Sequence, residues 1–385
     1  MRKVGVVLKA ALAVVAWAAV AGPAQAAVVG STPAPTWQTN GRVVITVISG
    51  NTAYLGGKFT SMRPAGAPAG TGEVPRHHAA AIDLTTGALL PWDPNANGLV
   101  DAIDVNGGTV YIGGGFTTVG GKSRRKVAAV DATTGAVTSF KAPVDGEVRA
   151  IDLSNGRLYL GGAFTTPNPY AAAVDPATGA AIPAWAPQLD GPVNALITTT
   201  DGSNHIVIGG AFNTLNGATS YAIGAVDPAS GASVTWNWHG PLRWGTHPFD
   251  VVALTADSTG VYAAGTGNGG SFMKFTQSTG DLDYIGGANG NVVGVAVMDG
   301  VLYVGGHYTG YCGLVMGNNW CPWVAARAHL LAVDAATGAL ETWHPAANSA
   351  LGVYTIAAGA GVVATGGDFT KLGGVVQQGF GEFKE

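Results

Sequence analysis

The sequence predicts an all-β fold, a seven-bladed β-propeller made of four-stranded blades. Three observations predict it: a Gly-Gly-x-Phe-Thr segment recurs along the chain, a valine precedes it at a nearly fixed distance, and a tight turn with a terminal aromatic residue follows. Repeats of about 50 residues that contain four short strands are typical of propeller blades. The 47% hydrophobic content excludes a disordered chain, and the 60 glycines have no Gly-x-y period, which excludes a collagen-like one.

The glycine-rich segment occurs seven times, and its fifth copy is degenerate. The first positions of the glycine pairs are Gly56, Gly113, Gly161, Gly209, Ala264, Gly305 and Gly366. A valine lies thirteen residues before this position in six copies and sixteen before it in the fourth. These valines are Val43, Val100, Val148, Val193, Val251, Val292 and Val353. We expect the valine and glycine segments to be the first and second strands of each blade.

The second half of the repeat is a hairpin followed by an aromatic residue. An alternating run ends in Asp and then Thr-Gly or Ser-Gly, as between Asp83 and Gly87. In such a turn the Asp side chain accepts hydrogen bonds from local backbone, and glycine adopts a positive φ. A short segment then ends at Trp92, Phe140, Trp185, Trp236 or Trp343. The hairpin supplies the third and fourth strands.

The two ends of the chain suggest how the ring closes. The sequence stops at Glu385, just after the third strand of the seventh copy, and Thr36-Trp37-Gln38 matches the aromatic end of a fourth strand. We therefore expect residues 28–37 to complete the last blade, which removes exposed sheet edges. On this interpretation residues 27–385 form a single domain.

Residues 1–26 read as a secretory signal peptide. Arg2, Lys3 and Lys9 are its only charged residues, and an apolar run leads to Ala24-Gln25-Ala26. Its removal changes the formal net charge from −4 to −7. An acidic chain is poorly suited to bind nucleic acid or an anionic membrane. We expect a secreted, extracellular protein without membrane insertion, and a monomer.

The two cysteines, Cys312 and Cys321, suit an oxidising compartment. They lie nine positions apart, and their even number favours a disulfide bond. The alternative is a pair of metal-binding thiolates, although the close Cys/His spacing typical of zinc is missing. We expect no metal site.

The combined motif resembles a known group of repeats. Tyr-x-Gly-Gly-x-Phe-Thr, Ala-Ala-x-Asp-x-x-Thr-Gly and the terminal Trp are similar to the secreted bacterial delta-60-type propeller repeats, a group without a settled activity. This resemblance covers residues 28–385 and implies the fold and export, but no catalytic residues. A weaker resemblance links the Asp-to-Trp segment to quinoprotein dehydrogenases, which have eight blades and a vicinal disulfide. Because Cys312 and Cys321 are not adjacent and the copies number seven, we expect no cofactor.

Three insertions depart from the repeat. From glycine pair to turn Asp, the first copy takes 27 residues and the sixth takes 29, whereas three regular copies take 14 to 18. A third insertion covers residues 237–248. Because successive strands alternate in direction, all three loops should decorate one face, where a rigid scaffold positions binding residues.

Aromatic and basic residues are concentrated in these loops. We interpret them as a binding surface for an extracellular glycan or protein, through stacking on sugar rings or a protein hot spot. The alternative is that the aromatic residues only pack the loops. The candidates are Trp238, His239, Arg243, Trp244, His307, Tyr308, Tyr311, Trp320 and Trp323.

A catalytic interpretation has less support. The chain lacks a Gly-x-Ser-x-Gly elbow and a phosphate-binding Gly-rich loop. An extracellular glycoside hydrolase or lyase would need two nearby carboxylates at the channel mouth. The acids available are Glu73, Asp93, Asp190 and Asp250, with Asp101 and Glu147 near the starts of first strands. Asp101 and Arg149 share one repeat position in neighbouring blades, which predicts a structural ion pair.

Overall fold

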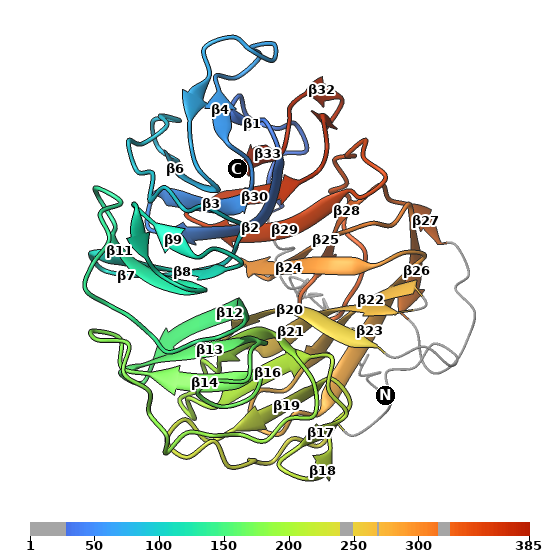
Figure 1. Ribbon diagram of the computed structural model, residues 1–385. Helices are drawn as coiled ribbons and strands as arrows, with labels where there is room; N and C mark the ends of the chain where they lie inside the picture. The colour runs from blue at the N-terminus through green and yellow to red at the C-terminus, as the bar shows by residue number, and fades with distance from the viewer. Residues whose placement is uncertain (1–27, 239–248, 268, 315–323) are drawn as a thin grey trace, which may run out of the picture.

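The computed structural model describes residues 28–238, 249–267, 269–314 and 324–385 (Figure 1). These residues form antiparallel β-sheets and no helix, so the protein is all-β. In the described part of the chain, no helix is long and apolar enough to cross a membrane.

Seven of the sheets begin with a pair of longer strands, and most add one more. The first sheet contains β2 (Arg42–Ser49), β3 (Thr52–Lys58) and β6 (Ala79–Asp83), and the second contains β7 (Val100–Asn106), β8 (Thr109–Gly114) and β11 (Val127–Asp131). The third contains β12 (Glu147–Ser154), β13 (Arg157–Ala163) and β14 (Ala171–Val174), and the fourth contains β15 (Val193–Thr198), β16 (Ile206–Gly210) and β19 (Ile223–Val226). The fifth contains β20 (Asp250–Asp257), β21 (Gly260–Gly267), β22 (Gly269–Phe275) and β23 (Leu282–Ala288), and it continues with β26 (Gly310–Leu314) and β27 (Ala325–Ala326). The sixth contains β24 (Val292–Met298), β25 (Val301–Gly306) and β28 (Leu330–Asp334), and the seventh contains β29 (Val353–Gly359), β30 (Val362–Gly367) and β33 (Phe380–Lys384).

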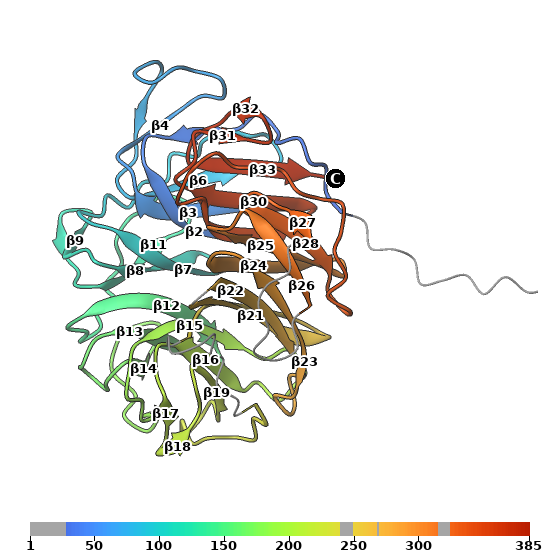
Figure 2. The same cartoon turned by 90° about the vertical axis from the view of Figure 1, so that its right-hand side faces the viewer.

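The first strands of these sheets lie beside one another. Each packs against the first strand of the next sheet, in the order β2, β7, β12, β15, β20, β24 and β29, and β29 packs against β2. The remaining strands extend outwards from them (Figure 1). The blue strands near the N-terminal end and the red strands near the C-terminal end lie side by side in both views (Figures 1 and 2).

The first glycine of each pair permits close packing between sheets. A Cβ added at Gly113 would lie 2.7 Å from a Val148 methyl of the next sheet. A Cβ at Gly366 of the last sheet would likewise lie 2.5 Å from a Val43 methyl of the first sheet. Real Cβ atoms do not approach other atoms so closely, so the repeated Gly and Val positions interlock one sheet with the next.

A β-bulge follows the repeat valine in each of the seven sheets. In the first sheet Val43 pairs with Gly57 and Ile45 pairs with Gly56, which leaves Val44 as the extra residue. A bulge of this kind bends the strand and redirects a side chain. The seven extra residues, called the bulge residues below, are Val44, Asp101, Arg149, Asn194, Val252, Val293 and Tyr354.

The fourth strand is shorter than the sequence predicts. In five sheets it is reduced to a single bridge to the third strand, such as Ile82 with Leu89, and only the fifth sheet has a full fourth strand, β23. The fourth segment leaves its own sheet because its aromatic residue docks on the next sheet. Trp92 Nε1 donates to the Asp131 carbonyl at 3.1 Å, and Trp185 Nε1 donates to the Asp227 carbonyl at 3.1 Å. These contacts between sheets take the place of the hydrogen bonds that a longer fourth strand would make with the third strand.

The segment before β2 contacts the last sheet. Ala34 forms a bridge with Glu382, and the Gly30 N–H donates to the Lys384 carbonyl at 2.9 Å. Trp343 Nε1 donates to the Gly30 carbonyl at 3.1 Å, as other repeat tryptophans donate to a turn of the following sheet. Residues 28–37 therefore lie where the sequence predicts a fourth strand for the seventh repeat.

Candidate functional site

Several sequence candidates lie outside the described residues. They are His239, Arg243, Trp244, Trp320, Cys321 and Trp323. Their assignment to a binding surface stays a prediction, and so does the disulfide between Cys312 and Cys321. Cys312 itself is buried on β26 (Gly310–Leu314).

Tyr308 and Tyr311 are core residues. Tyr308 is 1% exposed and occupies the Phe position of Gly-Gly-x-Phe-Thr, and its hydroxyl donates to the Val304 carbonyl at 2.7 Å. Tyr311 is 3% exposed and stacks on Phe272, with 6.2 Å between the ring centroids. It is buried because β26 joins the outer edge of the fifth sheet through β23. Neither ring is available to stack on a ligand.

Trp238 packs between the fourth and fifth sheets. Its ring lies 6.3 Å from that of Phe275, and its backbone N–H donates to the Gly280 carbonyl at 3.1 Å. The side chain is partly buried, and its Nε1 has no hydrogen-bond partner in the described residues. For this residue the contacts favour loop packing over an open binding surface.

The repeated basic residues serve the scaffold. The equivalent residues Arg76, Arg124 and Arg327 donate to backbone carbonyls of the following segment, those of Leu90, Thr138 and Glu341. His78 and His329 have positive φ, and their Nδ1 atoms each lie 3.1 Å from the carbonyl oxygen of the second repeat glycine.

Three of the loop acids also have local partners. Glu73 accepts from Ser61 and from the Gly70 N–H, and Asp93 lies 2.9 Å from His77 Nδ1. Asp190 accepts hydrogen bonds from the N–H groups of Asn213 and Thr214. In other sheets an Asn or Asp side chain accepts from two consecutive N–H groups in the same way. These contacts hold the hairpins in place, so we assign the three acids to the scaffold.

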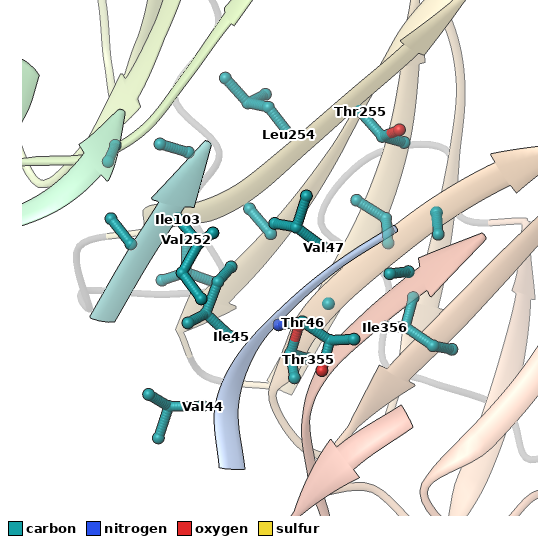
Figure 3. A pocket seen from close by; sticks show the side chains of 18 of the residues that line it. Val44, Ile45, Thr46, Val47, Ile103, Val252, Leu254, Thr255, Thr355 and Ile356 are labelled. Carbon is teal, nitrogen blue, oxygen red and sulfur yellow. The ribbon is translucent and has the colours of Figure 1, made fainter. Parts of the chain in front are cut away.

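The first strands enclose an axial cavity of about 350 Å³, called the channel below. All seven of these strands line it, mostly with aliphatic side chains such as Ile45, Ile103 and Leu254 (Figure 3). A volume in this range is sufficient for a small ligand or for a single side chain. The channel is the concave feature that the repeat itself generates.

All seven bulge residues line this channel. Five of them, with Glu147, also line a second cavity of about 280 Å³, called the vestibule below; these five are Val44, Asp101, Arg149, Asn194 and Val252. The bulge residues therefore stand where the vestibule meets the channel. Because each is the second or third residue of its strand, just after a connection on the predicted loop face, this end is the loop-face mouth.

Arg149 is held by two neighbours. Its Nε donates to Glu147 at 2.9 Å, and its Nη1 donates to the Asn194 side-chain oxygen at 3.1 Å. The predicted ion pair between Asp101 and Arg149 is wrong, because the arginine turns to the carboxylate on its own strand. Arg149 still acts on Asp101 through its charge.

Asp101 is left without a direct partner. Its Oδ2 atom is buried and has no hydrogen-bond partner among the described residues. Burial and the negative charge of Glu147 raise the pKa of Asp101 from 3.8 to about 7, against the opposite effect of Arg149. A carboxyl in this setting is part ionised and part protonated at neutral pH.

An aromatic and charged cluster forms the opposite side of the mouth. Arg42 forms an ion pair with Asp368 at 3.3 Å, and its guanidinium carbon lies 4.4 Å from the Tyr354 ring centroid. The His307 ring lies 5.0 Å from that of Tyr354. Burial lowers the pKa of His307, whose Nε2 has no hydrogen-bond partner in the described residues. Of the described sequence candidates, His307 is thus the one beside the mouth.

The sequence candidates omitted most bulge residues, although a signal for them exists. The position after the repeat valine holds Val, Asp, Arg, Asn, Val, Val and Tyr in successive copies, whereas the preceding position is always Val. Of these seven residues, only Asp101 and Arg149 figure in the sequence-based predictions, as an ion pair. No group of three or more His, Cys, Asp or Glu residues in the described ranges could hold a metal ion.

Comparison with known proteins identifies the fold. No protein-family model and no curated protein matches the sequence. The chain is similar to the crystal structure of the computationally designed Ika8 protein, with a TM-score of 0.54, 14% identity and coverage of 92% of this chain and 100% of that chain. It is also similar to the WD40 β-propeller domain of Doa1, with a TM-score of 0.54, 11% identity and coverage of 91% and 97%. The fold is therefore that of a β-propeller.

Proposed function

We propose that this protein is an exported binding module with seven blades, which holds an extracellular glycan or protein at the loop-face mouth of its channel. The observation that carries the proposal is the set of bulge residues. One backbone position is repeated seven times, yet its side chains are acidic, basic, amide, aromatic and aliphatic. A position that served packing alone would favour one residue type, as the neighbouring valine does.

The blade count and ring closure are part of this proposal. Contacts from the N-terminal segment support them: the Thr36 hydroxyl donates to Glu382 at 2.7 Å, and the Val29 N–H donates to the Tyr303 hydroxyl at 3.2 Å. The Gly366–Val43 packing repeats the Gly113–Val148 packing of consecutive sheets. The resemblance to delta-60-type repeats and the signal peptide predicted for residues 1–26 agree with an exported protein.

The chemistry of the mouth suits a ligand with both polar and apolar parts. Asp101, Arg149 and Asn194 come from three consecutive sheets and form a polar arc. Val252, Val293 and Val44 lie in other sheets and form an apolar arc, with the Tyr354 ring among them. Long loops at residues 58–78, 237–248 and 307–328 would extend the contact surface beyond the mouth.

One variant at the mouth tests this function. Tyr354→Ala removes the ring between Arg42 and His307, while Asn106→Ala changes an exposed residue at the other end of a first strand. Retention on a glycan array and on immobilised secreted and cell-wall fractions should fall about tenfold for Tyr354→Ala and stay unchanged for Asn106→Ala. Equal retention by a folded Tyr354→Ala protein would contradict the proposal.

The long loops need a separate variant. Replacing Trp244, Trp320 and Trp323 together with Ala should weaken retention on the same surfaces without changing the thermal unfolding midpoint. If retention persists with the fold intact, the loop aromatics do not contribute to binding, and the mouth alone carries the site.

A second candidate is an extracellular glycoside hydrolase or lyase. One observation favours it: Asp101, with its raised pKa, shares the vestibule with Glu147. A protonated and an ionised carboxyl group are the pair that glycosidic cleavage requires. Release of reducing ends from cell-wall polysaccharide, abolished by Glu147→Gln, would establish the enzyme; no release from any glycan bound on the array would exclude it.

A further inference from the structure

The vestibule and the channel differ in chemistry. The vestibule contains Asp101, Glu147 and Arg149, and it meets the channel at the bulge residues. Beyond these residues the walls are largely aliphatic, with Ile103, Ile151, Leu196, Leu254, Val295 and Ile356 (labelled in part in Figure 3). A ligand that enters from the loop face meets charged groups first and hydrocarbon second.

The charges at the boundary do not balance. Arg149 donates to Glu147 through Nε and to Asn194 through Nη1, so its charge already has a partner. Asp101 remains, with Oδ2 buried and without a hydrogen-bond partner in the described residues. An ionised carboxylate buried in this way is costly unless a cation or donor reaches it. When Asp101 ionises, the boundary therefore carries one unmatched negative charge.

We propose that the channel mouth binds the N-terminal residue of a peptide or protein, with its α-ammonium group beside Asp101 and an aliphatic side chain in the channel. The proposal rests on the binding function above and names the ligand chemistry of that site. An α-ammonium group carries one positive charge and up to three donors, and its side chain begins one carbon away. This geometry matches a charged boundary next to a hydrocarbon wall.

Other ligands fit these walls less well. A sugar ring would place most of its hydroxyl groups against aliphatic side chains, because among the wall side chains beyond the bulge residues only Thr46, Thr255 and Thr355 carry a hydroxyl. A free amino acid would add a carboxylate, while the nearest arginine is already paired with Glu147. Burial and Glu147 raise the pKa of Asp101, which fits a carboxyl that becomes fully ionised when a cation arrives.

A set of small probe compounds tests each part of this ligand on its own. Leucinamide carries the ammonium and the aliphatic side chain, glycinamide lacks the side chain, and N-acetyl-leucinamide lacks the charge. Free leucine and glucosamine test the free amino acid and the amino sugar. Calorimetric titration at pH 7, where most of the leucinamide carries the ammonium charge, should rank leucinamide first. Each of the others should bind at least about fivefold more weakly, because each lacks a matching group or adds an unmatched one.

Two variants localise the effect. Asp101→Asn keeps the shape of the side chain and removes its charge, and we expect at least about a tenfold loss of leucinamide affinity. Asp104→Asn is the matched control: it lies on the same strand, its carboxylate accepts the Leu153 N–H at 2.5 Å, and it does not line the channel. We expect that variant to bind leucinamide as the wild type does.

The outcomes distinguish this proposal from the broader function. Binding of leucinamide that is lost in Asp101→Asn and kept in Asp104→Asn supports it. Equal binding of N-acetyl-leucinamide, preference for glucosamine, or unchanged binding by Asp101→Asn overturns it. If glycan or protein retention depends on Tyr354 while leucinamide does not bind, the binding module stands and the N-terminal ligand is wrong.

Discussion

The repeat valine and the bulge residue beside it are neighbours in sequence, yet they behave in opposite ways. The valine is the same in all seven copies, and in six of them it packs against the first repeat glycine of the preceding sheet, as Val148 does against Gly113. The bulge residue has the same backbone setting but includes Asp101, Arg149 and Tyr354. Uniform positions thus hold the sheets together, whereas varied positions face the channel. Of these two consecutive residues, the valine therefore belongs to the scaffold and the bulge residue to the proposed site.

The largest effect is expected at the uniform positions. Gly113→Ala places a Cβ 2.7 Å from one methyl group and 3.0 Å from another, on Val148 and Ile151, so two neighbouring sheets must shift. We expect a loss of about 2–3 kcal/mol in the free energy of unfolding, the usual cost of overpacking. Gly108→Ala, which meets nothing within 4 Å, is the control and should change stability by less than about 1 kcal/mol. Chemical denaturation measures both, and equal effects would contradict the interlock.

The second-largest effect on stability is expected at the tryptophans that dock on the next sheet. Trp185→Phe removes the hydrogen bond to the Asp227 carbonyl and part of a buried ring that contacts Tyr159 at 4.9 Å. The second sheet already has Phe140 at this position. Its Tyr111 donates to the Pro176 carbonyl at 2.9 Å, just as Tyr159 beside Trp185 donates to the Pro228 carbonyl at 2.7 Å. Trp185→Phe should therefore cost about 1–2 kcal/mol without unfolding the protein. An unchanged denaturation midpoint would show that the docking bond is dispensable.

At Asp101 the expected effect on stability has the opposite sign. Its pKa is 3.8 ordinarily and about 7 in the fold, so the folded state holds this proton more tightly between those values. Stability from this group is present at low pH and is lost as pH rises through 7. Asp101→Asn, which resembles the protonated form, should be more stable than wild type at pH 8 by on the order of 1–2 kcal/mol and equal to it below about pH 4.

Denaturation of both proteins across this pH range checks the prediction. The charged groups that act on Asp101 are Glu147 and Arg149 of the neighbouring strand β12. Glu147→Gln should lower the pKa of Asp101 and reduce the pH dependence. If wild type and Asp101→Asn differ by the same amount at every pH, the carboxyl is not held protonated by the fold.

The smallest effect is expected in the apolar arc. Val293→Thr keeps the shape of a bulge residue and adds a hydroxyl that faces the channel. Stability should change by less than about 1 kcal/mol, because the side chain is only partly buried. Leucinamide affinity should nevertheless fall about threefold, since the hydroxyl disturbs the hydrocarbon wall. Unchanged affinity would remove Val293 from the contact surface.

The sequence allowed much of the fold to be predicted because its determinants are local and repeated. The glycine pairs, the Asp turns and the repeat valines appear at regular spacing, and Trp343 donates to residues 28–37, the segment expected to complete the last blade. The fourth strand was predicted too long, since its length depends on where Trp92 docks in the next sheet. That contact has no signal in the repeat spacing.

The site was harder to predict because composition drew attention to the loops. Aromatic residues such as Tyr308 and Tyr311 stood out from the repeat, but tertiary packing buries both. The bulge residues follow an ordinary valine, and nothing in one copy marks them. Their role emerges only when seven sheets bring one position to a common axis.

The most direct test makes the varied positions uniform. Asp101→Val, Arg149→Val and Asn194→Val, combined in one protein, give the polar arc the residue already present at Val44, Val252 and Val293. Calorimetric titration of leucinamide at pH 7, on protein with a cooperative thermal unfolding transition, is the measurement. The account predicts a folded protein with affinity reduced at least about tenfold. A folded triple variant that binds leucinamide as tightly as wild type would contradict the assignment of the bulge residues to the binding site.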